Sequence, residues 1–292
     1  MEKIAIIGAN GQLGSDVYLS LKDNYKIFPL LHKDIEITQR DSSNSCLSKI
    51  HPDIIVNTAA FHDLNACEKY PEKAFLVNGI GPRNLSIWCK ENDCILVHIS
   101  TDYVFDGEKN KPYLENDCTR PLNTYGITKL VGEFYISSIL ERNIIIRTTG
   151  LYGTHVCRGK SSKNFVEKFL ELIENKEIAE FGGQEICTPT FTENLAEQIK
   201  IIIKTNEFGI FHATSEGPCS WFEFGEEIIK QTNSTTKLVK IERKESASNI
   251  IRPKYTVLEN KHLNDLGINR MLEWKVALSE YLSKRNGEKK NE

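Results

Sequence analysis

The sequence contains no CxxC pair, no apolar run of bilayer length and little net charge. Its eight cysteines are scattered, which argues against a zinc site or a dithiol redox motif and favours reduced packing residues. No apolar run reaches the roughly 20 residues that span a bilayer, and the first residues lack the apolar core of a signal peptide, so we expect a cytoplasmic protein. A formal net charge of −3 without a basic stripe argues against nucleic acid or a membrane as a partner. Small molecules are the expected partners.

Short runs of β-forming residues alternate with helical or loop-like segments over about the first 150 residues. This alternation is typical of βαβ units. The runs DIIVN and NIIIR are apolar without alternation, as strands covered on both faces should be. We therefore predict an α/β fold with a doubly wound, Rossmann-like parallel sheet. The expected strands are residues 3–8, 25–31, 52–60, 93–100 and 142–149.

Three glycines follow the first expected strand and lead into a helix. Gly8, Gly11 and Gly14 have GxxGxxG spacing, so bare backbone N–H groups and a helix N-terminus can meet a pyrophosphate there. Glycines also serve tight turns, but this position favours dinucleotide binding. After the second strand, His32 and Lys33 stand where NAD-binding folds usually have an acidic residue. They favour a 2′-phosphate and NADPH, although two solvated polar residues explain them nearly as well and NADH stays open.

The pattern loosens after residue 153, where residues 163–175 and 192–204 read as amphipathic helices. No internal repeat or low-complexity linker separates the two parts of the chain. We predict a dinucleotide-binding domain over residues 1–150, joined by a returning helix near residues 191–204. A smaller C-terminal domain, residues 151–292, is expected to bind mainly substrate.

Tyr125 and Lys129 lie four residues apart at the start of an expected helix, so both face the same side. A fixed cation near a phenol lowers its pKa of about 10 and makes it a better proton shuttle. Thr101 ends a buried strand at the sheet edge where such folds bind ligands. An exposed i,i+4 pair of Tyr125 and Lys129 is the simpler interpretation. It would require that three separate segments of the sequence resemble one active site by accident.

These motifs resemble the extended short-chain dehydrogenase/reductase family and, within it, the dTDP-4-dehydrorhamnose reductases. The similarity covers most of the chain. It is carried by the glycine triplet, the Tyr125 to Lys129 spacing and the segments NTAAF, STDYVFDG, IIRTTGLYG, ACEKYPEKAFLVN, KNFVEKFL, GGQEICTPT and RPKYTVLENKHL. The resemblance implies NADPH-dependent reduction of the 4-keto group of a nucleotide-activated 6-deoxy sugar, dTDP-4-dehydro-L-rhamnose to dTDP-L-rhamnose. It allows a homodimer and implies no particular metal ligands.

The resemblance also implies roles for individual residues. Tyr125 would donate the proton, Lys129 would act as its electrostatic partner and hold the nicotinamide ribose, and Thr101 would position the keto oxygen. With His32 and Lys33, the expected cofactor-binding residues are Gly8, Gly11, Gln12, Leu13, Gly14, Glu36, Ile37, Ala59, Ala60, Phe61 and Lys129. The expected substrate-binding residues are Asn78, Asp102, Tyr103, Gly150 and Arg252.

Several positions depart from the family pattern. Gly150 stands where many of these reductases have a tryptophan, Gly183 where an aspartate is usual and His62 where a threonine is common. Tyr103 replaces the glutamate that related dehydratases need for elimination, which favours simple ketone reduction. An epimerase would reuse the same tyrosine and lysine. A non-catalytic NADP-binding subunit, similar to the regulatory β-subunit of methionine adenosyltransferase, is the alternative outside enzymes.

Overall fold

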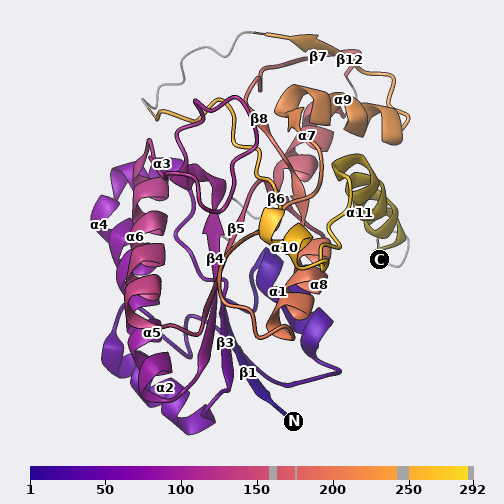
Figure 1. Cartoon of the computed structure of the whole chain (residues 1–292). Coiled ribbons are helices and arrows are strands. Elements are labelled where there is room, and N and C mark those ends of the chain that lie inside the picture. The colour runs from indigo at the N-terminus through magenta and orange to yellow at the C-terminus, as the bar shows by residue number, and fades with distance from the viewer. Residues whose placement is uncertain (158–162, 175, 242–249, 289–292) are drawn as a thin grey trace.

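The protein is described here from a computed structural model that covers residues 1–157, 163–174, 176–241 and 250–288. Six strands form one parallel sheet in the order β10-β5-β4-β3-β1-β2. The strands are β1 (Lys3–Ile7), β2 (Lys26–Leu30), β3 (Ile54–Asn57), β4 (Ile95–Thr101), β5 (Asn143–Thr148) and β10 (Gly209–His212). Helices cover both faces of this sheet (Figure 1), which confirms the doubly wound α/β prediction.

Each face of the sheet has its own apolar core. One core joins the strands to α1 (Gln12–Leu21), α8 (Thr192–Ile203) and α10 (Lys261–Asp265). The other joins them to α2 (Arg40–Ile50), α5 (Gly81–Glu91) and α6 (Thr124–Ile139). Strands β1, β3, β4 and β5 are almost entirely buried, and most of their side chains are apolar, as in residues 54–56 of β3.

Short helices connect the third and fourth strands. They are α3 (Leu64–Lys69), α4 (Pro71–Phe75) and the π-helix η1 (Leu76–Ile80), which runs directly into α5. The 3-10 turn η2 (Asp102–Val104) follows β4. These elements gather against the first turns of α6, beside the carboxyl ends of the strands (Figure 1).

The C-terminal half builds a second, smaller core above the sheet edge (Figure 1). Its helices are α7 (Phe165–Ile173), α9 (Trp221–Gln231) and α11 (Trp274–Glu288). Two-residue strands β6 (Leu151–Tyr152) and β9 (Thr190–Phe191) pair in parallel, β8 (Ile186–Cys187) pairs with β11 (Cys219–Ser220), and β7 (Ile178–Phe181) pairs with β12 (Lys237–Lys240). Ser220 starts α9 with the capping box that its spacing to Glu223 predicts.

The chain returns to the sheet after leaving it. Helix α8 packs on α1, and β10 then pairs with β5 to extend the sheet. The amphipathic helices expected near residues 163–175 and 192–204 are therefore present as α7 and α8, with residue 175 outside the described residues. Within the described part of the chain, no helix is long and apolar enough to cross a bilayer.

Candidate active site

Two glycines at the turn between β1 and α1 leave no room for a side chain. Gly8 has a φ of +80°, and a Cβ there would meet the Thr58 hydroxyl oxygen at 2.9 Å. A Cβ on Gly14 would lie 2.2 Å from the Gly8 carbonyl oxygen. Gly11 is the N-cap of α1 and, as a glycine, supplies no side-chain cap to the donors of the first helical turn. The turn can therefore present bare N–H groups to an anion.

Gln12 and Leu13, the two residues after Gly11, have different surroundings. Leu13 packs its side chain in the apolar core, so only its backbone can serve a ligand. The Gln12 amide nitrogen lies 3.4 Å from the carbonyl oxygen of Gly153, which joins this helix to the C-terminal half. Gln12 thus links the two parts of the chain at the turn.

The end of β2 carries the residues expected near the adenosine. His32 Nε2 lies 3.0 Å from Glu36 Oε2, and the His32 side chain is 89% exposed. Burial opposes ionisation of Glu36, but hydrogen bonds from Thr38 and the nearby His32 outweigh it and lower the carboxyl pKa. Lys33 is exposed beside them, and Ile37 is buried against Gly81 of α5. Two solvent-facing basic side chains are thus available at this edge.

The loop after β3 is held by two asparagines. Asn57 accepts the Ala59 N–H at 3.1 Å, and Asn78 of η1 accepts the Phe61 N–H at 2.9 Å. The Asn78 amide nitrogen donates to the Phe61 carbonyl and to the Thr128 hydroxyl on α6. Both ends of the Asn78 amide are therefore used to fix the loop that contains Ala59, Ala60 and Phe61.

The carboxyl end of β4 brings Thr101 and Asp102 beneath the start of α6. The Thr101 hydroxyl donates to Asp102 Oδ1 at 3.0 Å, and the Thr149 hydroxyl donates to Asp102 Oδ2 at 2.8 Å. Burial raises the Asp102 pKa to about 6, against hydrogen bonds that include those from Thr149 and Thr101. Both Asp102 oxygens are thus occupied by threonines.

Tyr125 lies in the first turn of α6, which Asn123 caps by accepting the Gly126 N–H. Its ring is 5.9 Å from the ring of Tyr103. Burial raises the Tyr125 pKa, a hydrogen bond with Thr101 opposes the rise, and the Asp102 carboxylate adds to it. The expectation that a cation lowers this pKa is therefore wrong for this arrangement, because burial outweighs the opposing hydrogen bond. Tyr125 and Thr101 are nonetheless in contact, as the sequence predicts.

Lys129 is turned towards β4. Its Nζ lies 2.5 Å from the Ile99 carbonyl oxygen and 3.0 Å from His98 Nε2, and its side chain is 1% exposed. Burial lowers the Lys129 pKa to about 8, although the carboxylate of Glu133, one turn further along α6, raises it. Sequence reasoning missed His98, whose only signal is a histidine inside an apolar strand.

Gly150 and Gly183, the two glycines that depart from the family pattern, both lie against the side chain of Trp221 of α9. Gly150 has a φ of +57°, and a Cβ there would lie 3.1 Å from Trp221 Cη2. Gly183 has a φ of +100°, and a Cβ there would lie 2.9 Å from Trp221 Cβ. An indole from the C-terminal half therefore occupies the space beside Gly150. Sequence analysis did not single out Trp221.

Arg252 comes close to the site from the C-terminal half. Burial raises the Tyr103 pKa, the Asp102 carboxylate adds to the rise, and the Arg252 guanidinium opposes it. The neighbouring Ile251 carbonyl accepts a hydrogen bond at 3.0 Å from the side chain of Asn123, the N-cap of α6. This contact docks the Arg252 segment beside the helix that carries Tyr125.

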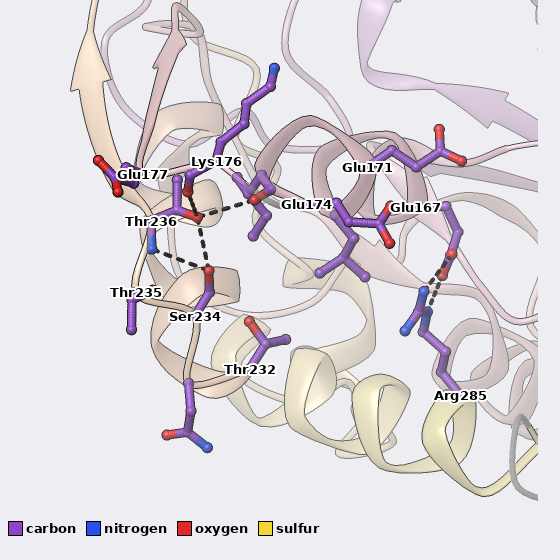
Figure 2. Close-up of a pocket in the computed structure, with 13 residues that line it drawn as sticks. Glu167, Glu171, Glu174, Lys176, Glu177, Thr232, Ser234, Thr235, Thr236 and Arg285 are labelled. Carbon is purple, nitrogen blue, oxygen red and sulfur yellow. Dashed lines mark hydrogen bonds and ion pairs between the residues drawn. The ribbon is translucent and has the colours of Figure 1, made fainter.

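A separate open hollow of about 740 Å³ lies in the C-terminal half, between α7, α11 and the segment before β12 (Figure 2). Its lining includes Thr236, which donates to main-chain carbonyls of Ile173 and Lys176, and the ion pair of Glu167 with Arg285. None of the predicted site residues lines it. Across the described residues, no group of three or more His, Cys, Asp or Glu side chains is placed to hold a metal ion. His62 lies with its Nε2 3.8 Å from Cys157 Sγ.

Comparison with known proteins identifies the family to which this site belongs. The profile of the RmlD substrate binding domain family matches residues 1–286. The chain belongs to this family. It is 36% identical over 287 residues to the spore coat polysaccharide biosynthesis protein SpsK of Bacillus subtilis (strain 168), covering 98% of this chain and 99% of that one.

Other relatives of this chain are named for their reaction. The dTDP-4-keto-6-deoxy-D-glucose reductase of Streptomyces niveus is 33% identical, with 94% of each chain covered. The crystal structure of dTDP-4-dehydrorhamnose reductase from Bacillus anthracis, in complex with NADP, has a TM-score of 0.91 and 31% identity, covering 97% of this chain and 99% of that one. The chain is thus a member of an NADPH-dependent oxidoreductase family, as its resemblance implies.

Proposed function

We propose that this protein reduces the 4-keto group of dTDP-4-dehydro-L-rhamnose to give dTDP-L-rhamnose, using NADPH. The observation that carries this proposal is the meeting of Thr101 and Tyr125 at the carboxyl end of β4, with Lys129 buried one turn further along α6. Relatives across nearly the whole chain are reductases of dTDP-linked keto sugars, which supports the substrate class. The substrate is expected above the sheet edge, where parallel α/β folds bind their ligands.

The backbone turn fits a dinucleotide, because Gly8 and Gly14 leave no room for a Cβ and Gly11 leaves the donors at the start of α1 uncapped. NADPH, when bound, supplies the hydride. In our proposal Gly8, Gly11, Gln12 and Gly14 hold the pyrophosphate, His32 and Lys33 meet the 2′-phosphate, and residues 59–61 line the cleft. Residues 1–150 with α8 then form the cofactor-binding part, and residues 151–292 mainly shape the sugar-nucleotide site.

Tyr125 is the acid in the proposed reaction. Its raised pKa keeps the phenol protonated at neutral pH, which is the form required to donate a proton. The Tyr125 hydroxyl hydrogen-bonds the keto oxygen and transfers its proton to that oxygen as the C4–H bond forms. The Thr101 hydroxyl, whose hydrogen binds Asp102 Oδ1 in the ligand-free protein, turns to donate to the same oxygen. The phenolate left behind is costly in a buried site, so the Lys129 ammonium is needed to stabilise it.

Elimination is disfavoured by the residues around Asp102. Its two carboxylate oxygens already accept from Thr101 and Thr149, and the next residue is Tyr103. The site therefore lacks a free acid and base pair for removing water, whereas one phenol suffices for ketone reduction. The same arrangement explains why we prefer a reductase over a dehydratase.

The test is to incubate the protein with NADPH and a dTDP-4-keto-6-deoxy sugar and to follow the nicotinamide absorbance. We expect oxidation of NADPH that Tyr125→Phe abolishes and Tyr135→Phe, a matched change further along α6, leaves intact. Chromatography of the sugar product identifies the stereoisomer. Tight NADPH binding without turnover would instead support a regulatory subunit, and turnover without NADPH consumption would support an epimerase.

A further inference from the structure

Three buried polar side chains form a line of hydrogen bonds beneath the loop after β3, which contains Ala59. Asn57 ends β3, His98 is its register partner on β4, and Lys129 reaches them from α6. The Asn57 amide nitrogen lies 3.1 Å from His98 Nδ1, and His98 Nε2 lies 3.0 Å from Lys129 Nζ. Asn57 and His98 are fully buried, so no water outside the line can supply a missing partner.

The backbone determines which way this line of hydrogen bonds runs. The Ala59 N–H can only donate, and it points at Asn57 Oδ1. The Asn57 amide is therefore oriented with its NH₂ group towards His98. His98 Nδ1 must accept that hydrogen bond, so it carries no hydrogen. Burial holds the His98 pKa well below its usual value, so the ring is neutral and its one hydrogen is on Nε2.

The Nε2–H of His98 then faces Lys129. An ammonium group has three donors and no acceptor. Two donors, the lysine N–H and the His98 Nε2–H, would then face each other without an acceptor between them. A neutral amine has a lone pair that can accept from Nε2–H, while one of its own N–H groups donates to the Ile99 carbonyl. Charging Lys129 in place would require His98 to carry its hydrogen on Nδ1, the Asn57 amide to turn over and Ala59 to lose its acceptor.

We propose that His98 is a positioning residue for Lys129: with Asn57 it donates a hydrogen bond from Nε2 to the lysine and so favours loss of the lysine's proton in the ligand-free protein. This inference rests on the proposed function, because it concerns the residue that stabilises the tyrosinate. It also links the charge of Lys129 to the backbone at Ala59, which lies in the loop proposed to line the cofactor cleft.

The other charges around Lys129 act in the opposite direction or lie elsewhere. Glu133, on the same helix, favours the ammonium, but it forms a 2.6 Å ion pair with Arg147 of β5. Among the other elements packed on α6, Glu68 of α3 binds Thr124 at the start of the helix, and Arg83 of α5 lies over Tyr135. Of the side chains on other elements that the structure describes, His98 is thus the one hydrogen-bonded to the lysine nitrogen.

The tautomer can be measured directly on the unmodified protein. The spectrum to record is a long-range ¹H–¹⁵N correlation of the ligand-free, ¹⁵N-labelled protein at about pH 9, above the Lys129 pKa of about 8. The His98 signals are those missing from His98→Gln. We expect the pattern of a neutral ring with hydrogen on Nε2. A pattern with hydrogen on Nδ1, or of a doubly protonated ring, would overturn the proposal.

A second variant reverses the direction of the line. Asn57→Asp keeps an acceptor for the Ala59 N–H and places a second carboxylate oxygen where the amide donor was. His98 Nδ1 must then donate, so we expect its spectrum to change to the Nδ1–H pattern. If the His98 spectrum of a folded Asn57→Asp protein is unchanged, Asn57 does not set the tautomer and the proposal fails.

The pH dependence of kcat/KM provides a functional readout that a purely structural role would not move. Loss of activity at high pH reports deprotonation of Lys129 in the free enzyme. A glutamine at position 98 can turn its carbonyl oxygen towards an ammonium, so His98→Gln should move this limb up by about one pH unit. A limb that stays in place or moves down contradicts the proposal.

The matched control is His212→Gln. His212 is also a fully buried neutral histidine of the same sheet, but its Nδ1 contacts the carbonyls of Tyr113 and Glu259 instead of Lys129. We expect this variant to leave the high-pH limb unchanged even if it lowers stability. Should the protein turn over no keto sugar at all, the proposed function fails while the tautomer experiment still decides the role of His98.

Discussion

Glu133 and Arg147 form a fully buried ion pair, with Arg147 Nη2 2.6 Å from Glu133 Oε2. The same carboxylate accepts the Ser100 hydroxyl, and Arg147 lies over the ring of Phe105. The pair ties α6 to the ends of β4 and β5. It therefore fixes the helix that carries Tyr125 and Lys129 against the edge of the sheet.

Breaking this pair on one side should strongly destabilise the fold. Arg147→Met leaves the Glu133 carboxylate buried without its cation, and such changes cost about 3–5 kcal/mol. Urea unfolding measures the loss. Arg142→Met is the control, because its pair with Asp93 is exposed and should be worth less than about 1 kcal/mol. Equal losses in the two variants would show that Arg147 is not held as described.

Removing the charge of Glu133 should also alter the pH profile of the reaction. The carboxylate raises the Lys129 pKa, which burial has lowered to about 8. In Glu133→Gln that support is lost, so the Lys129 pKa falls further and the amine loses its proton at lower pH. The high-pH limb of kcat/KM should move down, opposite to the shift expected for His98→Gln. An upward shift would remove Lys129 as the group responsible for the limb.

His212 should make the protein sensitive to acid. Burial and the nearby Arg147 guanidinium lower its pKa from 6.5 to about 3. The unfolded chain therefore binds a proton at higher pH than the folded protein does. Stability should fall as the pH drops from about 6.5 towards 3, by up to about 1.4 kcal/mol per pH unit. Unfolding free energies of the protein and of His212→Gln across this window measure the contribution, and parallel curves would contradict it.

Gly14 should tolerate no side chain. The Cβ of Gly14→Ala would lie 2.2 Å from the Gly8 carbonyl oxygen, so the turn must open. We expect a destabilisation of about 1–3 kcal/mol and a large loss of NADPH affinity, measured by titration of nicotinamide fluorescence. Gly287→Ala is the control, because a Cβ at that exposed position on α11 meets nothing within 4 Å. Unchanged NADPH affinity in Gly14→Ala would argue against the turn as the pyrophosphate site.

Trp221 should affect the sugar nucleotide more than the cofactor. Its indole lies against Gly150 at the junction of the two halves, so Trp221→Ala opens space there. We expect KM for the sugar nucleotide to rise about tenfold, which corresponds to about 1.4 kcal/mol, with little change in KM for NADPH. Phe222→Ala, at the next position of α9, where the ring lies beside Lys240, is the matched control. An equal effect of both variants would indicate a general loss of packing.

Much of the sheet could be predicted because its inner strands contain continuous apolar runs, as in residues 54–56. The place of β10 beside β5 could not, since a four-residue strand carries no signal of a partner about 65 residues away. His98 and Trp221 were missed because their importance comes from neighbours distant in sequence. The pKa of Tyr125 was predicted in the wrong direction because burial of its ring cannot be read from the Lys129 spacing. The individual site roles, domain limits, cytoplasmic location and homodimer stay predictions.

The central claim is that Tyr125 delivers the proton to the sugar keto oxygen. A crystal structure with NADP⁺ and the dTDP-sugar product bound tests it through the distance from Tyr125 Oη to the O4 oxygen of the sugar. We predict about 2.6–3.2 Å, with the Thr101 hydroxyl bonded to the same oxygen. A Tyr125 hydroxyl directed away from O4, with another acid in its place, would contradict the account.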